Sequence, residues 1–455
     1  MRLFPPPLDI GDNEGFVATK DIFGRANLGR GLTNLVSSVV DPMVVAIDGQ
    51  WGSGKTTFLK MWAGELRKSG FPVVYFDAFE NDYVEDAFTA IASEIISLAE
   101  EKRKANTRIA KQFVKKAIDV GKVLLRSGLK IGVKAATIGA LDATDFENAA
   151  NEIAGEAENL TDKYLGEFLT KQRQQKDAIQ GFRDALVELP ALLTEQPAEA
   201  EANANAKPLI FIIDELDRCR PHFALEVLER IKHFFSVQNV HFVLGTHLDQ
   251  LNNSVIAAYG PNIDARTYLQ KFIQLTFTLV DSAQHEHERI ITKYVAYLVK
   301  AMEFKPDDHE TVEYATRIIR YVSERRDLSL RAVERIMSVL AIALSYTPRN
   351  YFRPPPILGG LCVLKVTAPE LFVKAKRGTL EFAEVQSALA LDAKVEEREQ
   401  GTVEFYTKWW RFCTDLAPEQ ELIQELRSAL FQYSIERQQI VPILANDIID
   451  RLVSR

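Results

Sequence analysis

Short, uninterrupted apolar runs alternate with helical segments at the start of the chain and again from residue 207. Such runs are typical of parallel strands that are covered on both faces, and the segments between them repeat apolar residues at helical spacing. The pattern predicts strands at 42–48, 72–77, 207–214 and 241–246, with a further candidate at 275–279. It predicts helices at 31–40, 56–68, 83–101 and 223–235, and mostly helix after residue 280. Strands that alternate with helices predict an α/β fold around a parallel sheet.

A charged segment, residues 102–206, interrupts this alternation and reads as a helical insertion. Its first part, residues 102–134, holds eleven basic residues and one acidic residue, whereas residues 142–201 hold fourteen acidic residues and five basic ones. An apolar stripe at helical spacing runs through Ile109, Phe113, Ala117, Val120 and Leu124. Basic residues lie on the other side of that helix: Lys104, Arg108, Lys111, Lys115, Lys122 and Arg126. A basic amphipathic helix can pack on the acidic half or on another subunit, track nucleic acid, or lie on an anionic membrane surface.

The same pattern divides the chain into five parts. We expect a first core segment at 1–101, the charged insertion at 102–206, a second core segment at 207–280, a helical lid at 281–346 and a C-terminal helical region at 347–455. The last boundary follows a proline-rich break after Tyr346, where helical periodicity stops.

Composition narrows the class of protein. The net charge of −8 gives no whole-chain reason to expect nucleic-acid binding. Three scattered cysteines form neither a disulfide framework nor a zinc pattern. The N-terminus lacks the apolar stretch of a signal peptide, and no window reaches the ~18 apolar residues of a membrane-spanning helix. We therefore expect a cytoplasmic globular protein without a transmembrane segment.

The first candidate site follows the strand at 42–48. Residues 49–56, Gly-Gln-Trp-Gly-Ser-Gly-Lys-Thr, fit the Walker A pattern G-x-x-x-x-G-K-[ST] between a strand and a helix. In such a loop the backbone N–H groups surround phosphates, and the helix N-terminus favours negative charge. Lys55 would neutralise the β- and γ-phosphates, and the Thr56 hydroxyl would hold Mg²⁺. The predicted nucleotide-binding residues are Gly49, Gln50, Trp51, Gly52, Ser53, Gly54, Lys55, Thr56 and Thr57.

An acidic pair ends the apolar strand at 207–214 and completes a Walker B pattern. Asp214 would bind Mg²⁺, and Glu215 would act as the general base that activates the attacking water. Arg218 lies close by, and two roles stay open for it: an arginine finger toward a neighbouring subunit, or a pair with Asp217 that fixes the turn.

These motifs resemble those of the KAP family of P-loop NTPases. The likeness rests on Trp51–Leu59 and on Ile213–Pro221, where glutamate stands as the second acid, and it extends through 73–79 and 268–274. It covers roughly residues 20–100 and 207–345. The resemblance implies an ATPase with an additional central strand in the sheet and a helical lid, related to the STAND and AAA+ groups. Many prokaryotic relatives belong to mobile or anti-phage defence loci.

Two positions depart from the family, and one candidate depends on it. Relatives often carry Asp after the fourth core strand, where this chain has Thr246-His247, and either residue could hydrogen-bond the γ-phosphate there. Relatives also often place transmembrane helices where this chain has the charged insertion. Arg331 stands where family members have a sensor-like arginine, although an exposed helical arginine is mostly just solvated.

The expected function is ATP binding and hydrolysis with Mg²⁺, coupled to conformational change or assembly, in bacterial anti-phage defence or signalling. We expect a homo-oligomer that acts with a partner effector protein, because the chain shows no second catalytic pattern. Two alternatives stay open. One is a nucleic-acid-stimulated motor or loader that uses residues 102–134, and the other is a nucleotide-gated scaffold with little turnover.

Overall fold

The computed structural model gives a chain of two compact units, each described by itself. The core unit holds residues 9–49 and 55–279, and the helical unit holds residues 1–8, 50–54 and 280–455. The structure describes residues 1–84, 86–102, 107–127, 157–194, 207–279, 284–347, 351–392, 397–430 and 435–450.

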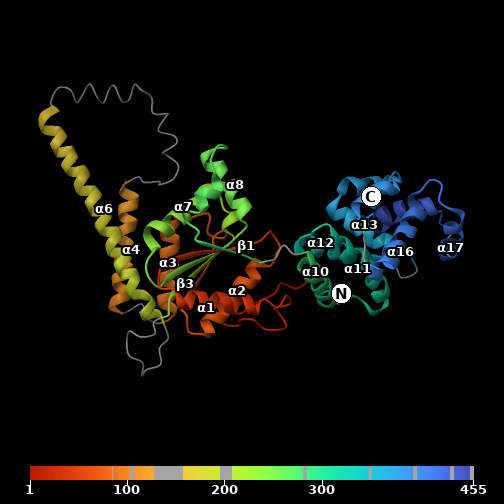
Figure 1. The fold of residues 1–455 in the computed structure, drawn as a ribbon, viewed down its shortest axis with the longest axis horizontal. Helices are drawn as coiled ribbons and strands as arrows, with labels where there is room; N and C mark the ends of the chain where they lie inside the picture. The colour runs from red at the N-terminus through yellow and green to blue at the C-terminus, as the bar shows by residue number, and fades with distance from the viewer. Residues whose placement is uncertain are drawn as a thin grey trace. The chain divides into compact units, whose positions relative to one another are not determined.

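A five-stranded parallel sheet forms the centre of the core unit (Figure 1). Its strands are β1 (Met43–Asp48), β2 (Val73–Asp77), β3 (Leu209–Asp214), β4 (Val240–Thr246) and β5 (Leu275–Thr278). All five predicted strands are thus confirmed. The strand order is β2-β3-β4-β1-β5, so β4 lies between the strand before the glycine-rich loop and the strand that ends in Asp214. This is the additional-strand arrangement that the resemblance implied.

Helices cover both faces of the sheet. Alternate residues of each strand point to opposite faces, and β1, β3 and β4 are buried along nearly their whole length, so both faces are apolar. On one face, Val45, Ile212 and Val243 pack under α1 (Ala26–Ser38) and α2 (Lys55–Lys68). On the other face, residues such as Phe211 and Phe242 pack under further helices. Those helices are α3 (Ala87–Glu101), α7 (Pro221–Arg230) with its continuation η3 (Ile231–Phe235), α8 (Leu248–Tyr259) and α9 (Ala265–Leu269).

The charged insertion adds two helices, α4 (Arg108–Ser127) and α6 (Ala157–Leu193), that lie side by side (Figure 1). The predicted apolar stripe of α4 faces inward: Phe113, Ala117 and Val120 are buried in the same hydrophobic cluster as the sheet. Leu124 lies in α4, but its side chain is outside the described part, as are Lys104 and most of the acidic stretch. The apolar face of the basic helix therefore packs within the core unit.

Phe182 of α6 connects the insertion to the core through aromatic contacts. Its ring centroid lies 5.1 Å from that of Phe88 in α3, 5.3 Å from that of Phe113 in α4 and 5.4 Å from that of Phe235 in η3. The Phe182 side chain is fully buried. One side chain thus joins two insertion helices to two core helices.

The helical unit is built around α13 (Pro355–Thr367), which is buried on all sides from Pro356 to Leu364. An all-round apolar helix is typical of the centre of a helical assembly. Around it lie α10 (Gln284–Ala301), α11 (His309–Arg325), α12 (Leu330–Tyr346), α14 (Pro369–Arg377), α15 (Phe382–Ala388), α16 (Glu397–Thr414), α17 (Gln420–Leu430) and α18 (Ile440–Ile443), with η6 (Leu444–Ile449). Short turns of helix are η2 (Leu216–Arg218), η4 (Pro306–Asp308) and η5 (Arg437–Gln439).

The predicted lid, 281–346, and the predicted C-terminal region, 347–455, both belong to this helical unit. The reason is that α13 packs against α11 and α12 across the proline-rich break. The five-part division of the chain itself stays a prediction. Among the described residues, no helix is long and apolar enough to cross a membrane.

We expect Phe182→Ala to lower the free energy of unfolding by about 3–5 kcal/mol, because it leaves a cavity between four elements. Phe4→Ala is the matched control, since Phe4 is 64% exposed and its removal should cost less than about 0.5 kcal/mol. Urea unfolding followed by circular dichroism measures both. Equal stability of the two variants would contradict the packing described for α6.

Candidate functional site

The candidate site lies where β1, β3 and β4 end at the same edge of the sheet. Asp48, Asp214 and Thr246 are the last residues of these strands. The register pairs Asp48 with Thr246 and Asp214 with Gly245, so the three strand ends are neighbours. Ligand sites in parallel α/β sheets form outside the carboxyl ends of the strands.

The glycine-rich loop connects β1 to α2 and has the backbone that its glycines predict. Gly52 has a φ of 82° and Gly54 a φ of 84°, a region where side chains are strained. The helix α2 begins at Lys55, directly after the loop. Thr56 and Thr57 therefore lie in its first turn, where unpaired N–H groups and the helix dipole favour an anion such as phosphate.

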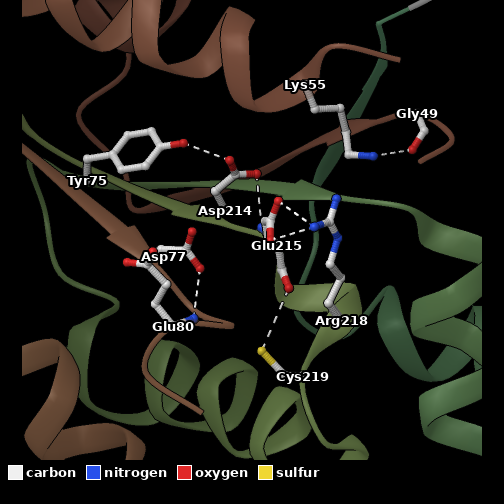
Figure 2. Close-up of polar contacts among 9 residues, drawn as sticks. All are labelled: Gly49, Lys55, Tyr75, Asp77, Glu80, Asp214, Glu215, Arg218 and Cys219. Carbon is white, nitrogen blue, oxygen red and sulfur yellow. Dashed lines mark hydrogen bonds and ion pairs between the residues drawn. The ribbon is translucent and has the colours of Figure 1, made fainter. Parts of the chain in front are cut away.

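Lys55 is buried beside the acidic residues of the site. Its Nζ donates a hydrogen bond to the Gly49 carbonyl oxygen, as Figure 2 shows. Burial lowers the pKa of Lys55, while Asp217, Asp214 and Asp48 favour its charged form. A buried ammonium group that donates to a neutral carbonyl can exchange this partner for a phosphate oxygen. The phosphate carries a negative charge, so the new hydrogen bond would be charge-assisted and stronger.

Asp214 lies at the end of β3 beside Tyr75 (Figure 2), and its side chain is almost completely buried. The Tyr75 hydroxyl donates to its Oδ2 at 2.7 Å, and the Glu215 backbone N–H donates to its Oδ1 at 2.9 Å. Burial raises the pKa of Asp214, whereas the hydrogen bonds from Tyr75, Thr56 and the Glu215 N–H lower it. Asp214 and the Thr56 hydroxyl, the two predicted metal ligands, thus lie within hydrogen-bonding reach of each other.

These two groups suit Mg²⁺, which takes oxygen ligands and usually binds one or two protein groups together with substrate phosphates and water. Among the described residues, no cluster of three or more His, Cys, Asp or Glu side chains forms a metal cage. A metal ion held by Thr56 and Asp214 would therefore need phosphate oxygens to complete its coordination.

Glu215 and Arg218 form an ion pair at the rim of the site. The Arg218 Nη1 lies 2.8 Å from both carboxylate oxygens of Glu215. The pKa of Glu215 is raised by burial and lowered by Arg218. Glu215 also has a φ of 60°, which is unusual for a residue with a side chain. Two of the predicted catalytic residues, Glu215 and Arg218, therefore bond to each other, and Arg218 does not extend away from the site.

The remaining candidate positions lie at the end of β4, directly before α8 and on α12. Thr246 is fully buried, and its hydroxyl has no hydrogen-bond partner among the described residues. His247 directly precedes α8. Arg331 lies in the first turn of α12, and within the helical unit a Cβ added to Gly52 would lie 3.1 Å from the Arg331 Cβ. The start of α12 is thus close to the turn of the glycine-rich loop.

Sequence reasoning missed Tyr75, Gly245 and Asp48. Tyr75 holds Asp214, and the Asp48 carboxylate accepts a hydrogen bond of 2.9 Å from the Leu248 N–H at the start of α8. Gly245 leaves room for Asp214: a Cβ there would lie 2.5 Å from the Asp214 Oδ1 and 2.4 Å from Leu59 Cδ1. The sequence signal was only a polar or small residue at or near the end of a predicted strand for Asp48 and Gly245, and a tyrosine in the middle of a predicted strand for Tyr75.

We expect Gly245→Ala to destabilise the protein by about 1–3 kcal/mol, because the added methyl group overlaps Asp214 and Leu59 in a close-packed core. Gly31→Ala is the matched control: Gly31 lies in α1, no atom lies within 4 Å of the position that its Cβ would occupy, and alanine favours the helix by roughly 0.5–1 kcal/mol. Thermal unfolding separates the two, and a Gly245→Ala protein as stable as Gly31→Ala would contradict this geometry.

Comparison with known protein families identifies the family of this chain. A family model described as the KAP family P-loop domain matches residues 28–347. No curated protein matches the chain. Among solved structures, the Aeropyrum pernix ORC2 protein in ADPNP–ADP complexes is similar over 99% of this chain and 97% of that one, with 12% identity and a TM-score of 0.32. The family match spans both core segments and the predicted lid, and the chain belongs to the KAP family of P-loop NTPases.

Proposed function

We propose that the chain binds and hydrolyses ATP with Mg²⁺ and couples this cycle to conformational change or assembly. The observation that supports it most is the enclosed Asp214 carboxylate, held next to Thr56 at the start of the glycine-rich loop's helix. Enclosing a carboxylate costs several kcal/mol unless it is well hydrogen-bonded. If the position were purely structural, burying an apolar side chain there would cost less free energy than burying a carboxylate. A metal-binding site, in contrast, requires the negative charge.

Each residue of the site has a role in this proposal. The loop N–H groups from Gly49 to Thr57 bind the phosphates, and Lys55 leaves the Gly49 carbonyl to neutralise them. Thr56 and Asp214 hold the metal ion, which supplies charge neutralisation at the transferred phosphate. At the position where relatives often carry Asp, the buried Thr246 hydroxyl donates a hydrogen bond to the γ-phosphate.

Glu215 acts as the general base in this proposal, and Arg218 restrains it before nucleotide binds. A carboxylate bonded at both oxygens to an arginine is a weaker base, because the guanidinium favours the ionised form. Moving Arg218 away would let Glu215 accept a proton from the attacking water and would make Arg218 available to the phosphate of a neighbouring subunit. Arg331 serves as a sensor of the bound nucleotide in the same scheme.

Homo-oligomeric assembly, a partner effector protein, a cytoplasmic setting and a role in bacterial anti-phage defence or signalling remain parts of this proposal. They rest on the family membership and on the sequence, where no second catalytic pattern accompanies the NTPase motifs. The effector activity would then come from the partner.

The first test is turnover by matched variants. We expect Lys55→Ala to lose nucleotide binding, and Glu215→Gln to bind ATP normally but hydrolyse it about 10²–10⁴-fold more slowly, as for loss of a general base. Lys68→Ala, an exposed lysine in the same helix, should keep full activity. Phosphate release and fluorescent-nucleotide binding measure both steps. Unchanged turnover in Glu215→Gln would exclude it as the base, and wild-type binding without turnover would favour the scaffold alternative.

The second test is assembly. We expect mass photometry to show a defined larger species for Glu215→Gln with ATP, and a smaller species without nucleotide or with ADP, because the substitution traps the ATP-bound state. Lys55→Ala with ATP is the control that should not assemble. A mass that stays constant under all these conditions would exclude nucleotide-gated assembly while leaving the hydrolysis proposal intact.

A further inference from the structure

The outer face of α4 carries a row of basic side chains that the site does not use. Arg108, Lys111, Lys115 and Lys122 are all exposed, and they recur at intervals of three, four and seven residues. Residues at such intervals lie on one face of a helix. We call these four residues the basic row.

The opposite face of α4 packs in the hydrophobic core of the core unit. Phe113 and Val120 are almost fully buried, and Phe113 contacts Phe182 of α6. On the flank, Lys116 is half-buried and its chain lies along α6 at Gly181. The basic row therefore lies on the face of α4 opposite the buried face. Its orientation is set by packing that a ligand need not rearrange.

Among the described residues, no acid pairs with the basic row, although Asp119 lies on the same helix face between Lys115 and Lys122. In the described part of the chain, none of its four members forms an ion pair or a side-chain hydrogen bond. Elsewhere on this chain, exposed bases such as Arg317 and Lys374 do pair with acids. On a protein with a net charge of −8, four cations that form no ion pair among the described residues, with one acid on their face, are a local excess of positive charge that would attract a polyanion.

We propose that the basic row binds the phosphate backbone of nucleic acid without reading its sequence. The row extends over about 21 Å, since an α-helix rises 1.5 Å per residue. The same length of duplex DNA carries roughly 12 phosphate charges. Four cations on one straight face can contact several of those phosphates together, as binding by counterion release requires.

The buried apolar face disfavours the other polyanionic partner, a membrane. Helices that lie on bilayers insert their apolar face among the acyl chains. In α4 that face is occupied by α3 and α6, and Ile118 is the exposed large apolar residue that remains on the described part of the helix. Electrostatic attraction alone would then have to hold the protein on lipid.

The experiment measures binding of full-length protein to a labelled 30-base-pair DNA and a labelled 30-nucleotide RNA between 50 and 200 mM salt. We expect the triple variant Lys111→Gln, Lys115→Gln, Lys122→Gln to bind roughly tenfold more weakly or worse at low salt. Its plot of log affinity against log salt should be shallower by about 2–3, since each phosphate contact contributes about 0.9 to that slope for duplex DNA.

The matched control neutralises three exposed lysines outside the insertion: Lys271→Gln, Lys300→Gln, Lys305→Gln. It changes the net charge equally and should leave affinity and slope unchanged, and thermal unfolding should show both triple variants folded. The proposal fails if neither nucleic acid binds at 50 mM salt, or if the two triple variants bind equally. Binding of the protein to vesicles rich in anionic lipid is measured in parallel. The proposal also fails if the protein binds these vesicles but neither nucleic acid, which would identify a membrane as the partner.

This binding test needs no nucleotide, so its outcome is separate from that of the hydrolysis test. Adding ATP afterwards asks whether the two activities are coupled. Stimulation of turnover by DNA or RNA in wild type, but not in the variant of the basic row, would connect nucleic-acid binding to the motor or loader alternative.

Discussion

The carboxylate of Asp214 is enclosed by the core, and the elements around it are arranged to satisfy its charge. Tyr75 reaches it from β2, Thr56 from α2 and the Glu215 N–H from its own chain. Gly245 of β4 makes space for it. A buried charge that loses one of its partners costs more than the partner's net contribution. These elements therefore cannot shift independently, and the edge of the sheet behaves as one constrained assembly.

The turn after Asp214 is part of the same constrained edge and positions Glu215 and Arg218. Glu215 adopts a left-handed backbone, which costs roughly 1–2 kcal/mol for a residue with a Cβ. In return its N–H bonds the Asp214 carboxylate and its side chain meets Arg218. Strained residues of this kind persist where the surroundings determine the conformation, and they are frequent at functional sites. The residues proposed as metal ligand, general base and restraining arginine thus all belong to one short segment.

The sequence was sufficient for features whose chemistry lies within a few consecutive residues. The glycine-rich loop, the acidic strand end and the apolar stripe of α4 are each local patterns. Tyr75 and Gly245 could not be recognised, because they meet Asp214 only through the order β2-β3-β4, and hydrophobic periodicity carries no strand order. The Glu215–Arg218 pair depends on a left-handed turn that a non-glycine residue does not indicate.

The strand order also has a consequence for how the chain is made on the ribosome. The first half of the core supplies β1 and β2, which are not neighbours in the sheet. The strand β1 ends at Asp48 and its partner β4 begins at Val240, so at about 5–20 residues per second that partner emerges roughly 10–40 s later. During this interval the insertion is synthesised while two apolar strands stay without their hydrogen-bonding partners. A nascent chain of this protein therefore depends on protection from aggregation until the second core segment arrives.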